Sequence, residues 1–384
     1  MSAASWQFIN PVHVRFGAGV RGELAAMLGG VAAKVLIVTT ARGRAQFEAD
    51  AILAPIAASG HVTWVDSVTP NPGLTDTQVE IDRLSNQSFD AVVAFGGGSA
   101  LDAAKALAAA LARGQENRNL AQMIANPAAL VGVGTLPIYA LPTTSGTGSE
   151  VTPFATIWDH ENAKKLSLAS PHLFPKAALV DPELTHGMPR AATLSTGLDA
   201  LNQAFESAWN RNGNPVSRLM AGRAIGLALD ALPVLAADLD SAPARAKIAE
   251  ASLLAGLCIS QSRTAICHSI SYPLTAHFDL AHGFACAFSM YAVAKRVAAE
   301  APEVLASVVA ISGRSDGAAV LTELAAVLAM CDLDQAIAAH LPNVDAVIAL
   351  QPEMFTPGRA DNFMLPMDND KLSQILRASF LPRG

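Results

Sequence analysis

The stretch Ala91-Val-Val-Ala-Phe-Gly-Gly-Gly-Ser-Ala-Leu-Asp-Ala-Ala-Lys105 joins a short apolar run to a glycine-rich turn and then to an alanine-rich helical pattern. Short apolar runs with β-branched residues are typical of buried strands in parallel sheets. Three glycines let a ligand approach the backbone closely, and the N-terminus of a following helix offers free N–H groups to an anion. The stretch therefore predicts a strand, a phosphate-binding turn and a helix. A tight connection without a ligand is the alternative, because the turn lacks the GxGxxG spacing.

Strands and helices are predicted to alternate on both sides of this stretch. Apolar runs that predict further strands lie at residues 12–20, 32–40, 61–66, 138–142 and 178–181, with helical patterns at 45–59 and 75–87. The segments 154–158 and 165–168 predict a hairpin. Strand and helix at this rhythm favour right-handed βαβ units on a parallel sheet.

A second polar turn, Thr143-Thr-Ser-Gly-Thr-Gly-Ser-Glu150, directly follows the strand predicted at 138–142. Ligands of open α/β sheets bind at the carboxyl ends of the strands, where this turn and the glycine turn both lie. The two turns together predict one ligand crevice. A polar surface loop is the alternative interpretation of the second turn.

Strand patterns fade after about residue 190, and alanine and leucine then recur with the period of a helix. The longest helical patterns cover 219–237, 244–258, 317–330 and 333–341. We therefore predict an α/β domain with a parallel sheet over residues 1–185 and an all-α domain over residues 186–384.

Side chains of metal-ligand type interrupt the apolar pattern of the second domain. They are Asp199, Gln203, His268 and His282. Asp199 and Gln203 are four residues apart, so their side chains share one face of a helix. A carboxylate and two imidazoles suit a divalent metal, and Gln203 stands where a fourth ligand is expected. The pattern predicts a metal site buried between helices.

The composition excludes several classes of protein. Hydrophobic residues make up 51% of the 384 residues and charged residues 15%, which favours a large folded core. The net charge is −7 and no basic block is present, so we expect no nucleic-acid partner. We also expect no membrane association, because no apolar run reaches the roughly 18 residues of a membrane helix.

The cysteines and the first residues of the chain both indicate a cellular compartment. The four cysteines are Cys258, Cys267, Cys286 and Cys331. They have no CxxC spacing and lie in apolar helical contexts, so they are interpreted as buried free thiols. The first residues show no signal peptide. We expect a cytoplasmic protein.

The motifs resemble those of the iron-dependent (group III) alcohol dehydrogenases, in order and spacing, from about residue 6 to residue 290. The segments that carry the resemblance are 96–105, 142–150, Asp181-Pro-Glu-Leu-Thr185, Gly197-Leu-Asp-Ala-Leu201 and His282-Gly283. The resemblance implies a dehydroquinate synthase-like architecture, with a Rossmann-like N-terminal domain and a helical C-terminal domain. It also implies NAD(H) or NADP(H), Fe²⁺ or Zn²⁺, and a homodimer.

The resemblance also assigns residues to the coenzyme. It places the pyrophosphate on Gly96, Gly97, Gly98 and Ser99, the adenine and phosphate side on Thr143, Thr144 and Thr147, and the ribose on Lys165. Asp102 and Thr40 are added to the same site. The choice of coenzyme stays open, because the acid of NAD-preferring members is missing and Arg42 follows Thr40, which permits NADPH.

Two residues depart from the family pattern. Gln203 replaces a His among the metal ligands, and its amide oxygen is a neutral, weaker donor than imidazole. Metal binding is therefore expected to be weakened. Tyr272 replaces a His that relays a proton in the family. Tyr272, Ser271 or a water is expected to pass the proton here.

The segments 208–212 and 263–275 resemble the phosphonoacetaldehyde reductase (2-hydroxyethylphosphonate dehydrogenase) branch. Arg263 lies five residues before His268, where a charge is costly unless paired, and its guanidinium suits a phosphonate or carboxylate. An internal ion pair is the alternative, and Arg211 is a weaker candidate for the same task. The implied function is the interconversion of a small anionic aldehyde, phosphonoacetaldehyde first, and its alcohol. A maleylacetate reductase-like enzyme, a general short-chain alcohol dehydrogenase and a non-catalytic nucleotide-binding protein are the alternatives.

Overall fold

The computed structural model describes residues 5–30, 33–126, 130, 134–162 and 164–383. The described chain separates into two compact units, each considered by itself below. The sheet unit comprises Pro11–Thr144 and Ser149–Thr185. The helical unit comprises the described residues up to Asn10, then Ser145–Gly148 and the chain from His186 onward.

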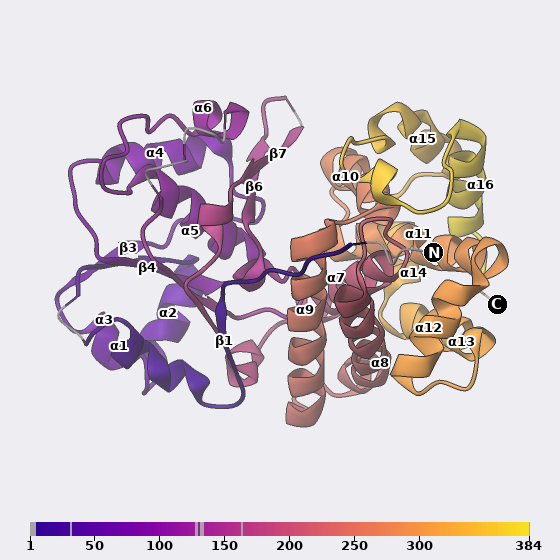
Figure 1. Ribbon diagram of the computed structural model, residues 1–384, viewed down its shortest axis with the longest axis horizontal. Helices are drawn as coiled ribbons and strands as arrows, with labels where there is room; N and C mark the ends of the chain where they lie inside the picture. The colour runs from indigo at the N-terminus through magenta and orange to yellow at the C-terminus, as the bar shows by residue number, and fades with distance from the viewer. Residues whose placement is uncertain (1–4, 31–32, 127–129, 131–133, 163, 384) are drawn as a thin grey trace. The chain divides into compact units, whose positions relative to one another are not determined.

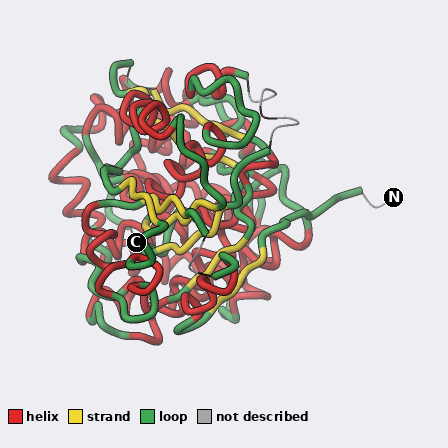
Figure 2. Tube along the Cα trace, turned by 90° about the vertical axis from the view of Figure 1, so that its left-hand side faces the viewer, coloured by secondary structure: helices red, strands yellow, loops and turns green. Residues whose placement is uncertain are grey.

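The sheet unit is built on six strands that are all parallel, in the order β1-β8-β5-β4-β2-β3. The strands lie side by side in Figure 2. Their bounds are β1 His13–Phe16, β2 Val35–Val38, β3 Val62–Val65, β4 Ala91–Gly96, β5 Ile138–Pro142 and β8 Ala177–Val180. The predicted parallel sheet is confirmed, although Ala32 at the start of the predicted strand over 32–40 lies outside the described residues.

The strand order creates a switch point in the sheet unit. The chain runs from β2 outward to β3 and then returns to place β4 on the other side of β2. In register, Val38 of β2 pairs with Ala94 of β4, and Gly96 pairs with Pro142 of β5. The carboxyl ends of these three strands therefore meet at one edge, where open α/β sheets bind their ligands.

The helices of the sheet unit are short except for α4 and α5. Their bounds are α1 Leu24–Met27, α2 Ala41–Ala49, α3 Ala54–Ala57, α4 Leu74–Leu84, α5 Gly98–Ala110 and α6 Leu120–Ala125. The helix predicted over 45–59 is wrong, because two short helices stand there. Asp50 takes an extended conformation after α2, and its carboxylate accepts hydrogen bonds from the N–H groups of Ile52 and Leu53. The predicted hairpin is confirmed as β6 Phe154–Asp159 and β7 Lys164–Ala169.

Helices form the whole regular structure described in the helical unit after residue 189 (Figure 1). They are α7 Arg190–Ala208, α8 Pro215–Ala237, α9 Ala242–Ser262, α10 Ile266–Phe278, α11 His282–Glu300, α12 Pro302–Ser312, α13 Gly317–Met330, α14 Leu333–His340, α15 Val344–Ala349 and α16 Asn369–Ser379. The helix predicted over 219–237 begins earlier than expected, at Pro215, because the N-cap Asn214 and Ser217 form a reciprocal capping box.

Among the described residues, helix α8 has the length and apolar composition of a membrane-crossing helix. Helices α12 and α13, which meet at a bend of 78°, have them when the two are counted as one span. The sequence reasoning did not anticipate this property of α8. Most of its apolar stretch is buried, however, and the helix packs against α7, α9 and α12. Such burial is the usual environment of a core helix, so the apolar composition is explained by packing.

Candidate metal centre and coenzyme site

Four side chains of metal-ligand type converge inside the helical unit. Asp199 comes from α7, His268 from α10, and His282 and Cys286 from α11. Their ligand atoms all lie within 4.8 Å of one another. Asp199, His268 and Cys286 are buried, whereas His282 is half-buried. The structure thus brings together the three predicted ligands Asp199, His268 and His282, and adds a cysteine to them.

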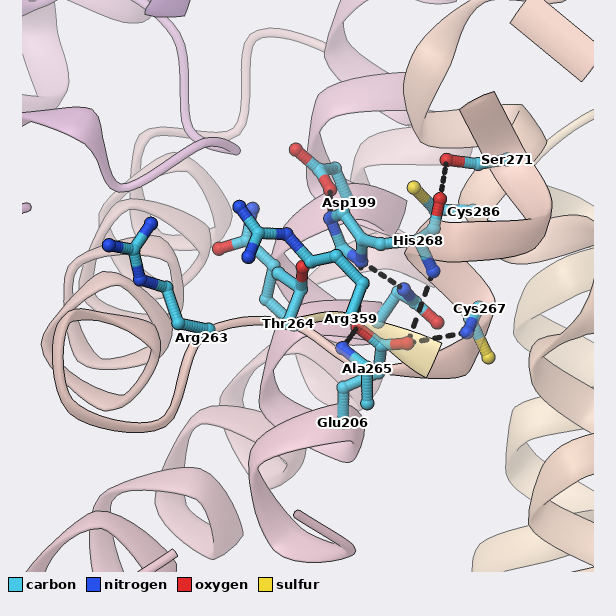
Figure 3. A network of polar contacts seen from close by, with 12 residues as sticks. Asp199, Glu206, Arg263, Thr264, Ala265, Cys267, His268, Ser271, Cys286 and Arg359 are labelled. Atoms are coloured by element: carbon cyan, nitrogen blue, oxygen red, sulfur yellow. Dashed lines mark hydrogen bonds and ion pairs between the residues drawn. The ribbon is translucent and has the colours of Figure 1, made fainter. Parts of the chain in front are cut away.

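His268 is held from both ring nitrogens (Figure 3). Its Nε2 lies 3.3 Å from Asp199 Oδ1, and its Nδ1 lies 2.8 Å from Glu206 Oε2. A carboxylate cannot donate, so the Nδ1 proton points to Glu206 and Nε2 faces Asp199. Burial lowers the pKa of His268, but Cys286, Glu206 and Asp199 together raise it well above its usual value. A proton on Nε2 therefore competes with a metal for this position.

Glu206 also caps the start of α10. It accepts backbone hydrogen bonds from Ala265 at 2.7 Å, Cys267 at 2.6 Å and His268 at 3.1 Å. These N–H groups at a helix N-terminus have no partner within the helix, so a buried carboxylate there satisfies them. One side chain therefore fixes both the position of α10 and the tautomer of His268. The sequence reasoning missed this residue.

His282 is the first residue of α11, and Gly283 follows it. A Cβ atom at Gly283 would lie 1.8 Å from the backbone oxygen of Ser195 in α7, so only glycine lets the two helices approach this closely. The His268 and His282 rings meet edge to face with their centroids 5.3 Å apart. The close packing at Gly283 thus positions the His282 imidazole in the cluster.

Cys286 lies one helical turn after His282. Its Sγ is 3.7 Å from His282 Nε2 and 3.9 Å from Nδ1. Burial raises the pKa of the Cys286 thiol, while neighbouring His268 lowers it. The sequence reasoning treated this residue as one more buried thiol. Its spacing of four from His282, the same as that between Asp199 and Gln203, is the signal that identifies it.

Gln203 lies one turn after Asp199 on α7, as predicted. Its Nε2 donates a long bond of 3.5 Å to the backbone oxygen of Thr147. Its Oε1 is buried and has no hydrogen-bond partner in the described part of the chain. A buried amide oxygen without a donor is costly, so this atom fits a role as a cation ligand. The donor set as a whole therefore fits a divalent metal.

Ser271 and Tyr272 lie on α10 beside the cluster. The Ser271 hydroxyl donates to the backbone oxygen of His268 at 2.8 Å. The Tyr272 ring stacks on His282 with a centroid separation of 6.4 Å, and its hydroxyl accepts a bond of 3.2 Å from Nε of Arg359. The Ser271 hydroxyl thus faces the cluster through Cys286, whose pKa it lowers, whereas the Tyr272 hydroxyl bonds Arg359.

Two arginines lie near Tyr272. Arg263 follows α9 with a positive φ of 62°, which is unusual for a residue other than glycine. Its pKa is lowered by burial first and then by Arg359, while Tyr272 raises it. The sequence reasoning did not identify Arg359. The predicted weaker candidate Arg211 instead donates to the backbone oxygen of Phe363 at 2.9 Å. Arg263 therefore lies within electrostatic reach of Arg359 (Figure 3).

The glycine turn of the sheet unit has the geometry of an anion-binding turn. Gly96 has a φ of 152°, and a Cβ there would lie 2.7 Å from that of Ala100. A Cβ at Gly97 would lie 3.0 Å from Thr144. Gly98 begins α5, whose N-terminus lies at the switch point described above. The N-terminus of this 13-residue helix and the two constrained glycines fit the predicted pyrophosphate site.

Thr143 and Ser99 belong to the two turns that follow the neighbouring strands β5 and β4. The Thr143 N–H donates to the backbone oxygen of Gly96 at 2.9 Å, which ties the two turns together. The Ser99 hydroxyl accepts from the N–H of Asn71 at 3.2 Å. The Thr40 hydroxyl caps α2 through the N–H of Gly43 at 2.9 Å. These contacts place the side chains at the carboxyl ends of neighbouring strands.

Asp102 and Lys105 brace the second turn from inside the sheet unit. The Asp102 carboxylate accepts from the Ser149 hydroxyl at 2.6 Å and from the Thr156 N–H at 2.8 Å. Lys105 Nζ donates to the backbone oxygen of Ser149 at 2.7 Å and to that of Phe154 at 2.8 Å. The Asp102 contacts are structural, and its part in coenzyme binding stays a prediction, as does that of Lys165 on β7.

Two buried charges of the sheet unit have displaced pKa values. Burial lowers the pKa of Lys105 to about 8 and raises that of Glu150 to about 7. The charge of Glu150 raises the pKa of Lys105, and the charge of Lys105 lowers the pKa of Glu150, so each partly opposes the effect of burial on the other. The charged forms of both groups are therefore disfavoured in the folded protein.

The predicted coenzyme turn over 143–150 is divided between the units, since 145–148 belong to the helical unit. A Cβ at Gly148 would lie 2.3 Å from Cα of Gly256, and one at Gly146 would lie 2.7 Å from Cβ of Thr196. These two glycines are explained by close packing on α9 and α7. Thr147 lies between them, and its role in coenzyme binding stays a prediction.

Two family models match the chain. The model of iron-containing alcohol dehydrogenase matches residues 11–182, and that of the C-terminal part of the Fe-containing alcohol dehydrogenase family matches residues 193–346. The NAD-dependent methanol dehydrogenase of Bacillus methanolicus is 31% identical over 301 residues, 76% of this chain and 77% of that protein. The chain belongs to the iron-containing alcohol dehydrogenase family. It is thus a member of a family of oxidoreductases.

Other family members are similar over different lengths. The phosphonoacetaldehyde reductase of Streptomyces viridochromogenes is 43% identical over 204 residues, and the match spans 52% of this chain and 51% of that protein. The chain therefore spans about half the length of this curated relative. Sulfoacetaldehyde reductase from Bifidobacterium kashiwanohense, solved with NAD⁺, is 27% identical with a TM-score of 0.85, covering 98% of this chain and 99% of that chain. The iron-containing alcohol dehydrogenase of Thermotoga maritima is 29% identical with a TM-score of 0.82, covering 98% and 99%.

Proposed function

We propose that this member of the family reduces a small anionic aldehyde with a nicotinamide coenzyme, and that its substrate is phosphonoacetaldehyde, which becomes 2-hydroxyethylphosphonate. The observation that carries the proposal is the pairing of Arg263 and Arg359 around Tyr272, next to His282 of the metal cluster. The reductases of phosphonoacetaldehyde and sulfoacetaldehyde among the similar proteins support it.

Electrostatics favours a doubly charged anion at this position. Arg359 lowers the pKa of the partly buried Arg263, and an anion bound close to both guanidiniums would offset this repulsion. A phosphonate offers three oxygens and up to two negative charges, which match two planar forks of donors. A carboxylate offers only one charge. The arginine pair therefore supports a phosphonate over a carboxylated substrate.

The chain's own residues would divide the work as follows. Arg263 and Arg359 would hold the anionic end of the aldehyde and orient its carbonyl toward the cluster. Tyr272 would deliver the proton to the substrate oxygen as the hydride reaches the carbonyl carbon, since its ring stacks on His282 of the cluster and its hydroxyl accepts a bond from Arg359. A divalent metal held by Asp199, His268 and His282 would supply Lewis-acid polarisation of the carbonyl.

The coenzyme would bind at the glycine turn of the sheet unit. Gly96, Gly97, Gly98 and Ser99 are proposed to hold the pyrophosphate of NAD(H) or NADP(H). The exposed Arg42 after Thr40 permits the additional phosphate of NADPH. We further propose a homodimeric enzyme of the cytoplasm.

One feature favours a second candidate. Gln203 in place of the family's His would suit a maleylacetate reductase-like enzyme, which works without the full set of metal ligands. Metal content then separates the two, because that candidate retains its full activity after metal removal.

The test is a comparison of kcat/KM for three aldehydes with NADH and with NADPH. The aldehydes are phosphonoacetaldehyde, a carboxylated aldehyde of similar length and neutral acetaldehyde. We expect phosphonoacetaldehyde to exceed acetaldehyde by at least about a hundredfold, the worth of two charge-assisted contacts. Equal or faster turnover of acetaldehyde would contradict the anionic substrate. Tight coenzyme binding without turnover of any aldehyde would instead indicate a non-catalytic nucleotide-binding protein.

A further inference from the structure

We propose that Cys286 is a metal ligand, so that the centre consists of Asp199, His268, His282 and a cysteine thiolate and is of the zinc type. The inference deepens the proposed function, because it rests on the metal dependence assumed there. Cys286 lies on α11, whereas Gln203 lies on α7. Its thiolate would supply the charged donor that the neutral Gln203 amide does not.

The distances between donor atoms carry the proposal. Metal–ligand bonds of about 2.0–2.3 Å in a tetrahedral site place neighbouring donors about 3.3–3.6 Å apart. Asp199 Oδ1 and His268 Nε2 are 3.3 Å apart, and Cys286 Sγ and His282 Nε2 are 3.7 Å apart. Two opposite edges of a tetrahedron are thus already close to the required length. The remaining separations lie within 4.8 Å, which a small side-chain adjustment closes.

The helices explain why the sulfur points to this place. Cys286 follows His282 by one turn of α11, so both side chains share the face of α11 that the contact between Gly283 and Ser195 presses against α7. Asp199 lies one turn after Ser195 on α7, on the same side of the helix. The thiol is fully buried and reaches ligand atoms of three helices.

The other buried thiols provide a contrast. The Cys258 thiol donates to the backbone oxygen of Ser217 at 3.1 Å, the usual fate of a structural cysteine in a helix core. Among the described residues, Cys286 is the cysteine whose sulfur belongs to a cluster of metal-ligand atoms. Cys258 is therefore the matched control for a test of Cys286.

Charge balance and ligand softness agree with the geometry. An Asp carboxylate and a Cys thiolate together neutralise a divalent cation, whereas Gln203 brings no charge. A thiolate selects Zn²⁺ over harder cations, and tetrahedral sites with sulfur and nitrogen ligands are typical of Zn²⁺.

The test uses cobalt as a spectroscopic substitute for zinc. The full-length protein is freed of metal with a chelator and loaded with an equimolar amount of Co²⁺. A thiolate ligand gives a near-ultraviolet charge-transfer band, which oxygen and nitrogen ligands do not give. We expect the band in the wild type and in Cys258→Ala, and its absence in Cys286→Ser. The Zn²⁺ affinity of Cys286→Ser should fall by more than the roughly 10–100-fold that is lost when a hydrogen-bond partner of a metal ligand is removed.

A measurement on the unmutated protein covers the case in which Cys286→Ser does not fold. X-ray absorption of the zinc-loaded wild type should show one sulfur at about 2.3 Å. Bound cobalt or zinc without a sulfur ligand would overturn the inference, and so would failure to bind either metal.

The two proposals fail in different ways. Aldehyde reduction by a metal-loaded enzyme that has no metal–sulfur contact would leave the proposed function intact and refute the role of Cys286. A metal–sulfur contact without reduction of any anionic aldehyde would refute the proposed function and uphold the role of Cys286.

Discussion

The carboxylate of Glu206 lies 2.8 Å from Nδ1 of His268, and Asp199, seven residues earlier on α7, lies 3.3 Å from Nε2 of the same ring. Two acidic residues two turns apart on one helix thus hold the imidazole from both sides. Because Nδ1–H donates its hydrogen bond to Glu206, the lone pair of the neutral imidazole is at Nε2, where a metal can bind. Glu206 is therefore a positioning residue whose removal should be felt at the metal.

The variant Glu206→Gln should bind metal more weakly. A Gln side chain has a single acceptor oxygen, so it leaves unpaired some of the N–H groups that Glu206 now satisfies. We expect Zn²⁺ affinity, measured by competition with a chelator, to fall about 10–100-fold. Unfolding free energy should fall by about 1–3 kcal/mol. The matched control Glu250→Gln alters a pair with Arg223 and should change neither quantity. Unaltered zinc affinity in Glu206→Gln would refute the positioning role.

The variant Gly283→Ala should loosen the contact of α11 with α7. Its methyl group would overlap the backbone oxygen of Ser195, at 1.8 Å, so the helices must separate. We expect a loss of about 1–3 kcal/mol in unfolding free energy, together with weaker metal binding through His282. Gly317→Ala is the control, since its nearest neighbour, Leu305, would be 3.6 Å away. Denaturant unfolding checks the prediction, and equal stability of the two variants would contradict it.

The variant Arg359→Ala should impair recognition of the anionic substrate. Loss of one charge-assisted contact of about 1.5–3 kcal/mol predicts a rise of about 10–100-fold in KM for phosphonoacetaldehyde. KM for the coenzyme and turnover of acetaldehyde should change much less. Arg223→Ala, which removes an exposed partner of Glu250, serves as the control. If KM for both aldehydes rises equally, Arg359 has a structural role and does not recognise the anion.

The variant Glu150→Gln should flatten part of the pH dependence of stability. Burial raises the pKa of Glu150 from 4.5 to about 7, so the folded state holds its proton more tightly than the unfolded state. This tighter proton binding contributes on the order of 3 kcal/mol to the free energy of unfolding. The contribution is complete below pH 4.5 and is lost as the pH rises through about 7. Lys105, with a pKa lowered to about 8, acts only above this window. Unfolding free energies across the window should slope downward in the wild type and in the exposed control Glu161→Gln, and less steeply in Glu150→Gln, where the raised pKa of buried Asp102 still contributes. An unchanged slope in Glu150→Gln would assign the effect to other groups.

The sequence predicted the features that depend on local periodicity. The parallel strands have apolar runs, and the helices have alanine and leucine at helical spacing, so the α/β half and the helical half were predicted correctly. The helix over 45–59 was wrong because the extended backbone and carboxylate of Asp50 interrupt a pattern that is otherwise helical. Helical periodicity does not reveal a capping residue that ends one helix and begins another.

The residues missed in the site have partners that are distant in sequence. Glu206 bonds backbone groups about sixty positions away, at Ala265 and Cys267, and nothing in its own helix announces them. Arg359 lies in an irregular segment where no period assigns it a face. Cys286 was visible through its spacing from His282, but a buried thiol is the commoner meaning of a helical cysteine.

The chain passes from one compact unit to the other after Asn10, Thr144, Gly148 and Thr185. Neither unit is therefore a continuous segment of the gene. A recombination event with a single breakpoint near residue 185 would carry Gly146 and Gly148 away from the helices against which they pack. Exchange of the sheet unit between relatives would thus succeed only where residues 145–148 of the incoming chain match the resident helices α7 and α9.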